Sequence, residues 1–259
     1  MNKKKVNLWK VNIDFYKREN IFPGFSIDCV ILGFHKGKIR VLLREFEIND
    51  YWALLGGFML KSEDADQAAY RILKSYTQLD DIFLQQFYLF SDPNRTVMPD
   101  NLELAFNKII HENSWEWVAN RFISMGYFAL IKYDEVSLPP KVKSRLKWFD
   151  IQNLPPLYAD HQNIIHTALK VIRSLLPILP IGYQLLPEKF TMTELRKIYE
   201  IILNRNLDRR NFQRKVLSEG NIIQLDEKKD NRQYNPPSLF SFKKENLDFL
   251  TNEDMGPIL

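Results

Sequence analysis

Residues 56–76 read GGFMLKSEDADQAAYRILKSY, and this stretch decides how the first half of the sequence is interpreted. Its apolar residues from position 65 onward recur at helical spacing, which predicts a helix over residues 64–77. Asp64 and Gln67 have the spacing of a capping box, so the helix is expected to begin there. The two glycines interrupt an apolar run and indicate a bend or a close approach of the backbone.

Runs of apolar and β-branched residues lie on both sides of this helix. Strands are expected over residues 25–34, 38–46, 52–60, 83–90, 122–132 and 146–149. The first two runs are joined by His35-Lys36-Gly37, which is typical of a hairpin. A hairpin, a bend, a helix and further strands indicate a mixed α/β or α+β domain.

The connection over residues 96–120 is too long for an ordinary loop. It contains apolar residues at helical spacing, followed by Trp115 and Trp117. Two interpretations stay open for this insertion. It is either a lid or partner contact, or a helix packed on the edge of the domain.

A second unit is expected towards the C-terminus. Residues 160–176 carry an amphipathic helical pattern, and the proline-rich stretch 177–187 after them is expected to contain a domain boundary. Thr191 and Glu194 then have the spacing of a capping box at the start of another helix.

The segments after this helix complete a recognisable motif. After a short turn, Asp208 is placed to cap a second helix that ends near Gly220. Strand candidates over residues 221–225 and 239–242 flank the polar loop 226–237. Helix, turn, helix and hairpin predict a winged helix-turn-helix.

The second helix of this motif has two different faces. Phe212 and Val216 lie one turn apart and are expected to face the core. The opposite face offers cations for phosphates or guanine edges, and an amide that can pair with adenine. A solvated basic surface is the alternative, but the capped helix before it and the basic loop after it favour DNA binding. The expected DNA-binding residues are Arg209, Arg210, Asn211, Arg214, Lys215, Ser218, Lys228, Lys229 and Arg232.

Charge is distributed unevenly along the 259 residues. The whole chain carries 36 Lys and Arg against 32 Asp and Glu, a net charge of +4. Residues 188–245 carry 13 basic and 9 acidic side chains, and residues 1–10 carry four lysines and no acid. Residues 11–187 are nearly neutral, with 19 basic and 20 acidic side chains. Two basic regions around a neutral body are a hint of a polyanionic partner.

The composition also excludes several classes of protein and site. The single cysteine, Cys29, allows no internal disulfide, and the four histidines lack metal-ligand spacing, so neither a metal nor a cofactor is expected. The N-terminal MNKKK is not followed by the apolar segment of a signal peptide. The longest uncharged stretch, 174–187, is too short to span a bilayer, so we expect a cytoplasmic protein without a membrane partner.

The spacing within residues 56–76 resembles the Nudix box. Five residues lead from Gly57 to Glu63, seven more lead to Arg71, and the resemblance extends over about residues 22–154. It implies an α/β/α sandwich of α+β class, in which Glu63 and Arg71 form a structural pair.

One departure from the Nudix box concerns catalysis. In active Nudix hydrolases, three glutamates after the arginine hold divalent cations on one face of the helix. The corresponding residues here are Ile72, Ser75 and Tyr76, which provide no carboxylate for Mg²⁺. The resemblance therefore implies a Nudix-type domain without hydrolase activity.

A Nudix-type domain followed by a winged helix is similar to the Nudix-related transcriptional regulators of bacteria. The C-terminal residues that carry this resemblance are LPEKFT (186–191), LDRRNF (207–212) and YNPPSLFSF (234–242). It implies a homodimer that binds palindromic operator DNA and whose Nudix-type domain senses a sugar or an ADP-ribose-like effector. The insertion 96–120 and the turn Asn235-Pro236-Pro237 in the wing depart from the family pattern.

Polar side chains at strand ends are the candidates for effector binding, because a sugar requires hydrogen-bonding groups beside an aromatic face. They are Arg44, Trp52, Asp92, Asn94, Arg95 and Tyr127. Asp92 and Asn94 have a second interpretation, as turn formers that only cap the backbone.

The expected organisation has five parts. They are a basic N-terminal segment (1–21), a Nudix-type sensing domain (22–155), a helix and proline-rich linker (156–187), a winged helix-turn-helix (188–245) and a tail (246–259). Two alternative functions stay open beside a ligand-responsive regulator. One is a hydrolase of nucleoside diphosphate derivatives with unusual metal ligands, and the other is a protein-binding module anchored by Trp115 and Trp117.

Overall fold

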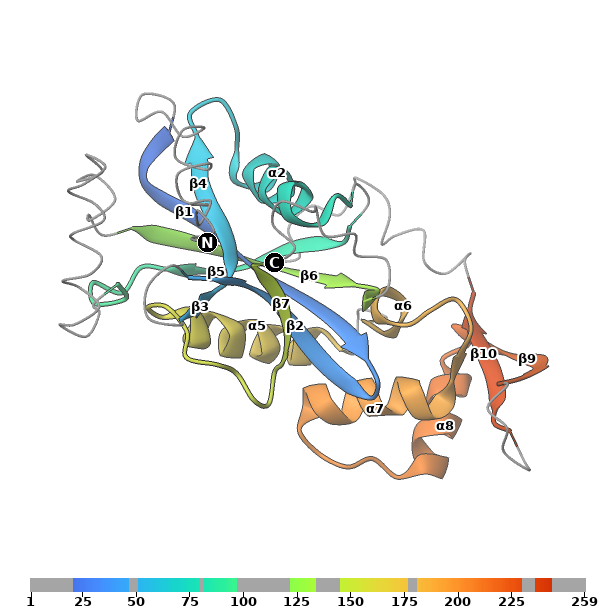
Figure 1. Cartoon of the computed structure of the whole chain (residues 1–259). Coiled ribbons are helices and arrows are strands. Elements are labelled where there is room, and N and C mark those ends of the chain that lie inside the picture. The colour runs from blue at the N-terminus through green and yellow to red at the C-terminus, as the bar shows by residue number, and fades with distance from the viewer. Residues whose placement is uncertain are drawn as a thin grey trace, which may run out of the picture.

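The structure is a computed structural model that describes residues 21–46, 51–79, 82–96, 122–133, 145–176, 181–229 and 236–243. Figure 1 shows a large sheet with helices on both faces, followed by a smaller unit with its own sheet. The basic N-terminal segment up to residue 20, both tryptophans of the insertion, Arg232 and the tail 246–259 lie outside the described residues. Among the described helices, none combines the length and the apolar character that crossing a bilayer requires.

The large sheet is built around its long first strand. Its strands are β1 (Ile21–His35), β2 (Lys38–Glu45), β3 (Trp52–Ala53), β4 (Leu55–Leu60), β5 (Leu84–Phe90), β6 (Ile123–Ile131) and β7 (Leu146–Asp150). The order is β3-β2-β1-β6-β5, while β4 pairs with β1 and β7 pairs with β2. The turn between β1 and β2 places Lys36 and Gly37 at positive φ, as a two-residue hairpin requires. β1 runs parallel to β6 and antiparallel to β2 and β4.

The glycine pair lies where β4 pairs with β1, opposite Ile27 and Asp28. A Cβ atom on Gly56 would stand 2.6 Å from the Asp28 carboxylate and 2.6 Å from the Ile27 carbonyl oxygen. The close approach expected from the sequence is therefore present. The strand expected over residues 52–60 is, however, interrupted at Leu54, between β3 and β4, and not at the glycines.

Helices cover the two faces of the large sheet, so this unit is the expected sandwich (Figure 1). Side chains of β1 alternate between two cores because successive residues of a strand point to opposite faces. Cys29 and Ile31 pack in the core with α2 (Ala65–Thr77), whereas Val30 and Leu32 belong to the core that contains α5 (His161–Leu175). Burial raises the pKa of the Cys29 thiol well above its usual range, so this cysteine is inert.

The C-terminal unit has the winged-helix topology. Its elements are α6 (Ile181–Leu185), β8 (Phe190–Thr191), α7 (Met192–Leu203), α8 (Arg209–Ser218), β9 (Ile222–Lys228) and β10 (Ser238–Phe242), with the strand order β8-β10-β9. Two features differ from the sequence expectation. Part of the proline-rich stretch forms α6, and β9 continues to Lys228 through residues expected to be a loop.

The two units share one hydrophobic core. It contains Leu43 of the large sheet, Ile172 of α5 and Ile198 of α7. α7 contacts both β2 and α5, and α6 contacts β1 and β6. At the end of this junction, Arg173 Nε of α5 donates a hydrogen bond of 2.8 Å to the carbonyl oxygen of Ile202. The winged helix is therefore packed against the sandwich and not merely tethered to it.

Candidate functional site

The helix α8 presents a cationic face to solvent. Phe212 and Val216 are 8% and 6% exposed and point into the core, as their spacing predicts. Asp208 begins the helix by accepting the N–H of Asn211 at 2.8 Å. The side chains on the remaining surface of α8 are exposed: Arg209, Arg210, Asn211, Arg214, Lys215 and Ser218.

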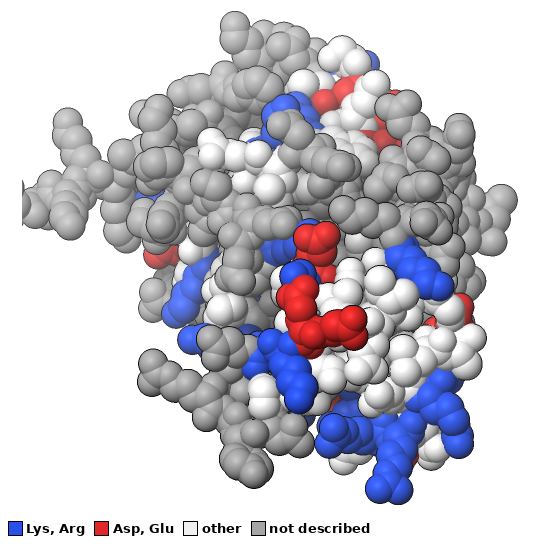
Figure 2. All heavy atoms as spheres, turned by 90° about the vertical axis from the view of Figure 1, so that its right-hand side faces the viewer, with Lys and Arg blue, Asp and Glu red and all other residues white. Residues whose placement is uncertain are grey.

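Two contacts order the exposed face of α8. Arg214 Nη2 donates to Asn211 Oδ1 at 2.9 Å, and Ser218 Oγ donates to the carbonyl oxygen of Lys215 at 2.7 Å. Figure 2 shows Lys and Arg side chains gathered at the lower edge of this side of the molecule, at the height of α8 in Figure 1. This surface has the charge needed to contact DNA phosphates, and donors able to reach base edges.

The wing offers fewer available cations than the sequence implied. Lys229 Nζ lies 2.6 Å from Glu194 Oε1 of α7. Lys189, just before β8, forms an ion pair of 2.7 Å with Glu227 of β9. Lys228 is exposed, and Arg232 lies outside the described residues. Lys229 thus links the wing to the start of α7, where Glu194 also completes the capping box with Thr191.

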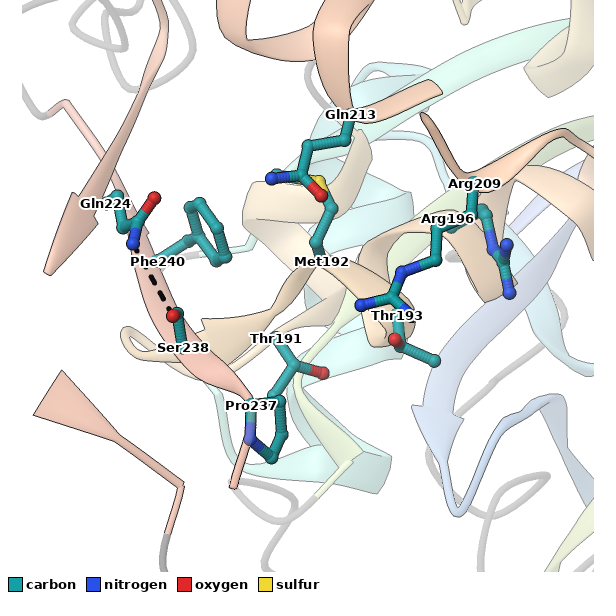
Figure 3. A pocket seen from close by; sticks show the side chains of 10 residues that line it. All are labelled: Thr191, Met192, Thr193, Arg196, Arg209, Gln213, Gln224, Pro237, Ser238 and Phe240. Atoms are coloured by element: carbon teal, nitrogen blue, oxygen red, sulfur yellow. Dashed lines mark hydrogen bonds between the residues drawn. The ribbon is translucent and has the colours of Figure 1, made fainter. Parts of the chain in front are cut away.

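A cavity of about 170 Å³ opens between α7, α8 and the wing strands. Figure 3 shows Arg196 and Arg209 on one side of it, and Gln224 and Ser238 on the other. Gln213 of α8 also lines this cavity and is only half-buried. Except for Arg209, these residues were not expected at the site. Gln213 could have been found from its position one turn after Arg209, but the contributions of α7 and β9 depend on tertiary packing.

The loop between β4 and α2 is held by the predicted pair of Glu63 and Arg71. Arg71 donates two hydrogen bonds to the Glu63 carboxylate, at 2.8 and 2.5 Å, and a third of 2.9 Å to the carbonyl oxygen of Phe58. The N–H of Leu60 donates to the same carboxylate at 2.7 Å. Partial burial alone would raise the pKa of Glu63, but these hydrogen bonds outweigh it and hold the pKa below its ordinary value.

The three residues that the resemblance aligns with the Nudix glutamates have different surroundings. Ile72 and Tyr76 are 2% and 6% exposed and belong to the core beneath α2. Ser75 is exposed, and its hydroxyl donates to the carbonyl oxygen of Ile72 at 2.6 Å. In the part of the chain that the structure describes, no cluster of His, Cys, Asp and Glu side chains is arranged to hold a metal ion.

The effector candidate Arg95 lies inside the protein and is 7% exposed. Its guanidinium donates two hydrogen bonds of 3.0 Å to Asp160, which precedes α5, and lies 3.5 Å from Asp28 of β1. Asp28 also accepts a hydrogen bond of 2.5 Å from the Ser124 hydroxyl. Arg95 therefore ties the start of α5 to the sheet.

The other effector candidates have different surroundings. Tyr127 is buried on the opposite face of the sheet, where its hydroxyl donates to Asp66 of α2 at 2.5 Å. Trp52 packs edge-on against Phe149, and the half-buried Arg44 guanidinium lies over the ring of Phe46. Asp92 and Asn94 are exposed, and Asp92 accepts the N–H of Asn94 at 2.7 Å, the turn-forming role considered above.

Sequence reasoning missed the buried histidine beside this network. His161 is 5% exposed, and its Nδ1 accepts the N–H of Leu54 at 2.9 Å. Its Nε2 lies 3.7 Å from Asp28. Burial lowers the pKa of His161 although the charge of Asp28 opposes the shift, so the ring is neutral at physiological pH. His161 is the first residue of the amphipathic helix α5, and nothing in the neighbouring sequence indicates that its ring is buried beside Asp28.

Comparison with known proteins identifies the C-terminal unit. Residues 182–242 match the family of the NrtR DNA-binding winged helix domain. A Nudix-like fold followed by a winged helix of this type is similar to the Nudix-related transcriptional regulators. A curated relative is the ADPR responsive transcriptional repressor NtrR of Acinetobacter baylyi. It is 24% identical over 242 residues, which cover 91% of this chain and 88% of that protein.

Two solved structures have a fold similar to that of this chain. NrtR of Shewanella oneidensis in complex with a 27mer DNA superposes with a TM-score of 0.64 at 22% identity, over 85% of this chain and 93% of that one. A MutT/nudix family protein from Enterococcus faecalis gives a TM-score of 0.61 at 20% identity, over 93% and 95% of the two chains. The predicted fold class, a Nudix-like domain with a C-terminal winged helix, is confirmed.

Proposed function

We propose that this chain is a transcriptional repressor that binds operator DNA as a homodimer through its winged helix and responds to ADP-ribose. The observation that carries the DNA-binding role is the exposed cationic face of α8, within a unit of the NrtR DNA-binding winged helix type. The repressor role and the effector are supported by the A. baylyi relative, because the alignment with it spans both units. The cytoplasm is the proposed location, since a repressor of this kind acts on chromosomal operators.

Base and phosphate contacts are assigned to the exposed side chains of α8, together with Lys228 and Arg232 of the wing. Lys229 is assigned an indirect role, since its ammonium group is paired with Glu194. Among the effector candidates, Arg44, Trp52, Asp92 and Asn94 keep accessible atoms. Arg95 and Tyr127 are instead assigned to support the domain, because both are buried and bonded to carboxylates.

The Nudix-type domain senses its ligand without hydrolysing it. Ile72 and Tyr76 are buried core residues and Ser75 is a neutral hydroxyl, so the helix face that carries metal-binding glutamates in active Nudix hydrolases carries none here. Glu63 is held by Arg71, which favours an architectural role for the remaining carboxylate. These observations support regulation over the hydrolase alternative.

Fluorescence polarisation with the full-length protein tests this proposal. The probe is labelled duplex DNA from the region upstream of its own gene, titrated at several salt concentrations with and without ADP-ribose. Arg214→Ala combined with Lys215→Ala is expected to weaken binding and to reduce the slope of log K against log[salt] by about 2, since each phosphate contact contributes about 0.9. ADP-ribose is expected to release the DNA and to remain intact in the presence of Mg²⁺. Failure of the wild-type protein to bind any duplex, or turnover of ADP-ribose, would overturn the proposal.

A further inference from the structure

The cavity between α7, α8 and the wing strands points to a second kind of DNA contact beside the exposed face of α8. We propose that it receives one phosphate group of the DNA backbone, held between the guanidinium groups of Arg196 and Arg209. This inference rests on the proposed function and adds a site to it. The argument depends on the charge of the cavity, its donors, its size and its position.

The charge of the cavity favours an anion. Within the described part of the chain, the Arg209 guanidinium makes neither an ion pair nor a hydrogen bond. Arg196 Nε is buried without a hydrogen bond, and it forms a long ion pair of 3.6 Å with Glu200 one turn later on α7, which does not line the cavity. Both side chains line the same side of the cavity (Figure 3). Two neighbouring cations repel each other, and a phosphate between them replaces that repulsion with two charge-assisted contacts.

The neutral groups around the cavity add hydrogen-bond donors. Thr193, Gln213, Gln224 and Ser238 line it, and Gln224 Nε2 donates one of its hydrogens to Ser238 Oγ at 3.4 Å. No aspartate or glutamate is among its described lining residues. The N–H of Thr193 has no acceptor within the helix because it lies in the first turn of α7. The capping box satisfies the N–H groups of Thr191 and Glu194 but not that of Thr193. The lining thus supplies donors around a positive centre, as phosphate binding requires.

The volume of the cavity limits what it can hold. Sites for cofactors and other whole small molecules usually occupy about 300–1,000 Å³. The present cavity, at about 170 Å³, suits a single compact group such as a phosphate. Its wall is also polar over most of its residues, so an apolar side chain of a protein partner is a poor occupant.

The position of the cavity connects it to the DNA-binding face. Gln213 follows Arg210 by three residues on α8 and precedes Arg214 by one, so the cavity adjoins the exposed cationic face. When a recognition helix lies in the major groove, the backbone of the flanking strand passes beside it. A phosphate held by Arg196 and Arg209 would therefore fix the register of α8 on the duplex without reading sequence.

Salt-dependent DNA binding by the full-length protein tests the cavity directly. The variants are Arg196→Gln, Arg209→Gln and the conservative Arg196→Lys, with Lys170→Gln as the matched control because Lys170 is an exposed cation on α5. The probes are the upstream duplex and an unrelated duplex of equal length. Thermal melting verifies that each variant is folded.

A phosphate contact predicts a particular pattern of results. Arg196→Gln and Arg209→Gln should weaken binding to both duplexes by the same factor and reduce the salt slope by about 1, because a lost phosphate contact acts on all sequences alike. Arg196→Lys should keep the slope and lose part of the affinity, and Lys170→Gln should behave as the wild type. Unchanged slopes in folded Arg196→Gln and Arg209→Gln, with normal wild-type binding, would overturn the phosphate site alone. Absence of wild-type binding to either duplex would overturn the site and the proposed function together.

Discussion

Arg71 donates hydrogen bonds to both carboxylate oxygens of Glu63, with Nε 2.8 Å from Oε2 and Nη2 2.5 Å from Oε1. The pair joins the loop after β4 to the middle of α2, and the same guanidinium also binds the Phe58 carbonyl oxygen. Glu63 accepts the Leu60 N–H as well, so its contacts close the loop on itself. In this chain, two residues of the Nudix box act as a structural clamp.

Removing the charge of Glu63 tests that clamp. Glu63→Gln is expected to lower the free energy of unfolding at pH 7 by about 1.5–3 kcal/mol, the range for hydrogen bonds that involve charged groups. Because its pKa is lowered on folding, this contribution is present above the unfolded pKa of about 4.3 and is lost as pH falls through the lower folded value. Urea unfolding between pH 7 and pH 3 measures both effects. Glu45→Gln, at an exposed residue of β2, is the control and should change stability little.

Glutamate substitutions at the positions that the Nudix resemblance aligns with metal-binding glutamates distinguish the exposed position from a buried one. Ser75→Glu should change stability by less than about 0.5 kcal/mol, since Ser75 is exposed. Ile72→Glu should cost at least about 3 kcal/mol, because it places an unpaired carboxylate among core residues that are almost completely buried. Chemical denaturation of the two variants gives the comparison. Equal stability of both would show that position 72 is not a core position.

The local elements were predictable because a few neighbouring residues determine each of them. Both capping boxes, at Asp64 and at Thr191, have the reciprocal hydrogen bonds that their spacing implies. The i, i+4 spacing of Phe212 and Val216 likewise predicted which face of α8 is buried. The end of β9 was missed because its last residues are charged and exposed, which gives a strand without an apolar alternation.

The candidate effector site was far less predictable, since its contacts join residues that are distant in the sequence. Arg95 bonds to Asp160, 65 residues away, and Tyr127 bonds to Asp66, 61 residues away. A residue type at a strand end does not reveal which face of the sheet it occupies or which acid it meets. Those depend on register and packing, which only the folded chain specifies.

The buried ion pairs of Arg95 should dominate the stability of the junction between the sheet and α5. Arg95→Leu is expected to reduce the free energy of unfolding by about 3–5 kcal/mol, because it leaves the buried carboxylate of Asp28 without its guanidinium partner. Asp92→Ala, in the exposed turn nearby, is the control and should have a small effect. Denaturant unfolding distinguishes the two.

A double variant tests whether Asp28 is the source of that cost. Adding Asp28→Asn to Arg95→Leu removes the unpaired buried charge. The free energy of unfolding of the double variant should therefore fall by less than the sum of the decreases in the two single variants. Strict additivity would mean that Arg95 and Asp28 contribute independently, in spite of their contact.

His161 should make stability depend on pH in a range separate from that of Glu63. Its Nδ1 accepts the Leu54 N–H, so protonation removes a buried acceptor. Burial lowers its pKa on folding, with Arg44 acting in the same direction and Asp28 against it. The unfolded chain therefore binds a proton first, and stability is fully present above about pH 6.5 and declines as pH falls towards the lower folded value.

Unfolding measurements between pH 7.5 and pH 5 check this expectation. Wild-type stability should fall with a slope approaching about 1.4 kcal/mol per pH unit within the window between the two pKa values. His161→Asn keeps an acceptor near the position of Nδ1 but does not titrate, so its stability should be lower at pH 7.5 and nearly flat down to pH 5. His166→Asn, at an exposed position of the same helix, should retain the wild-type slope. If His161→Asn kept that slope as well, the neutral buried histidine would not be its source.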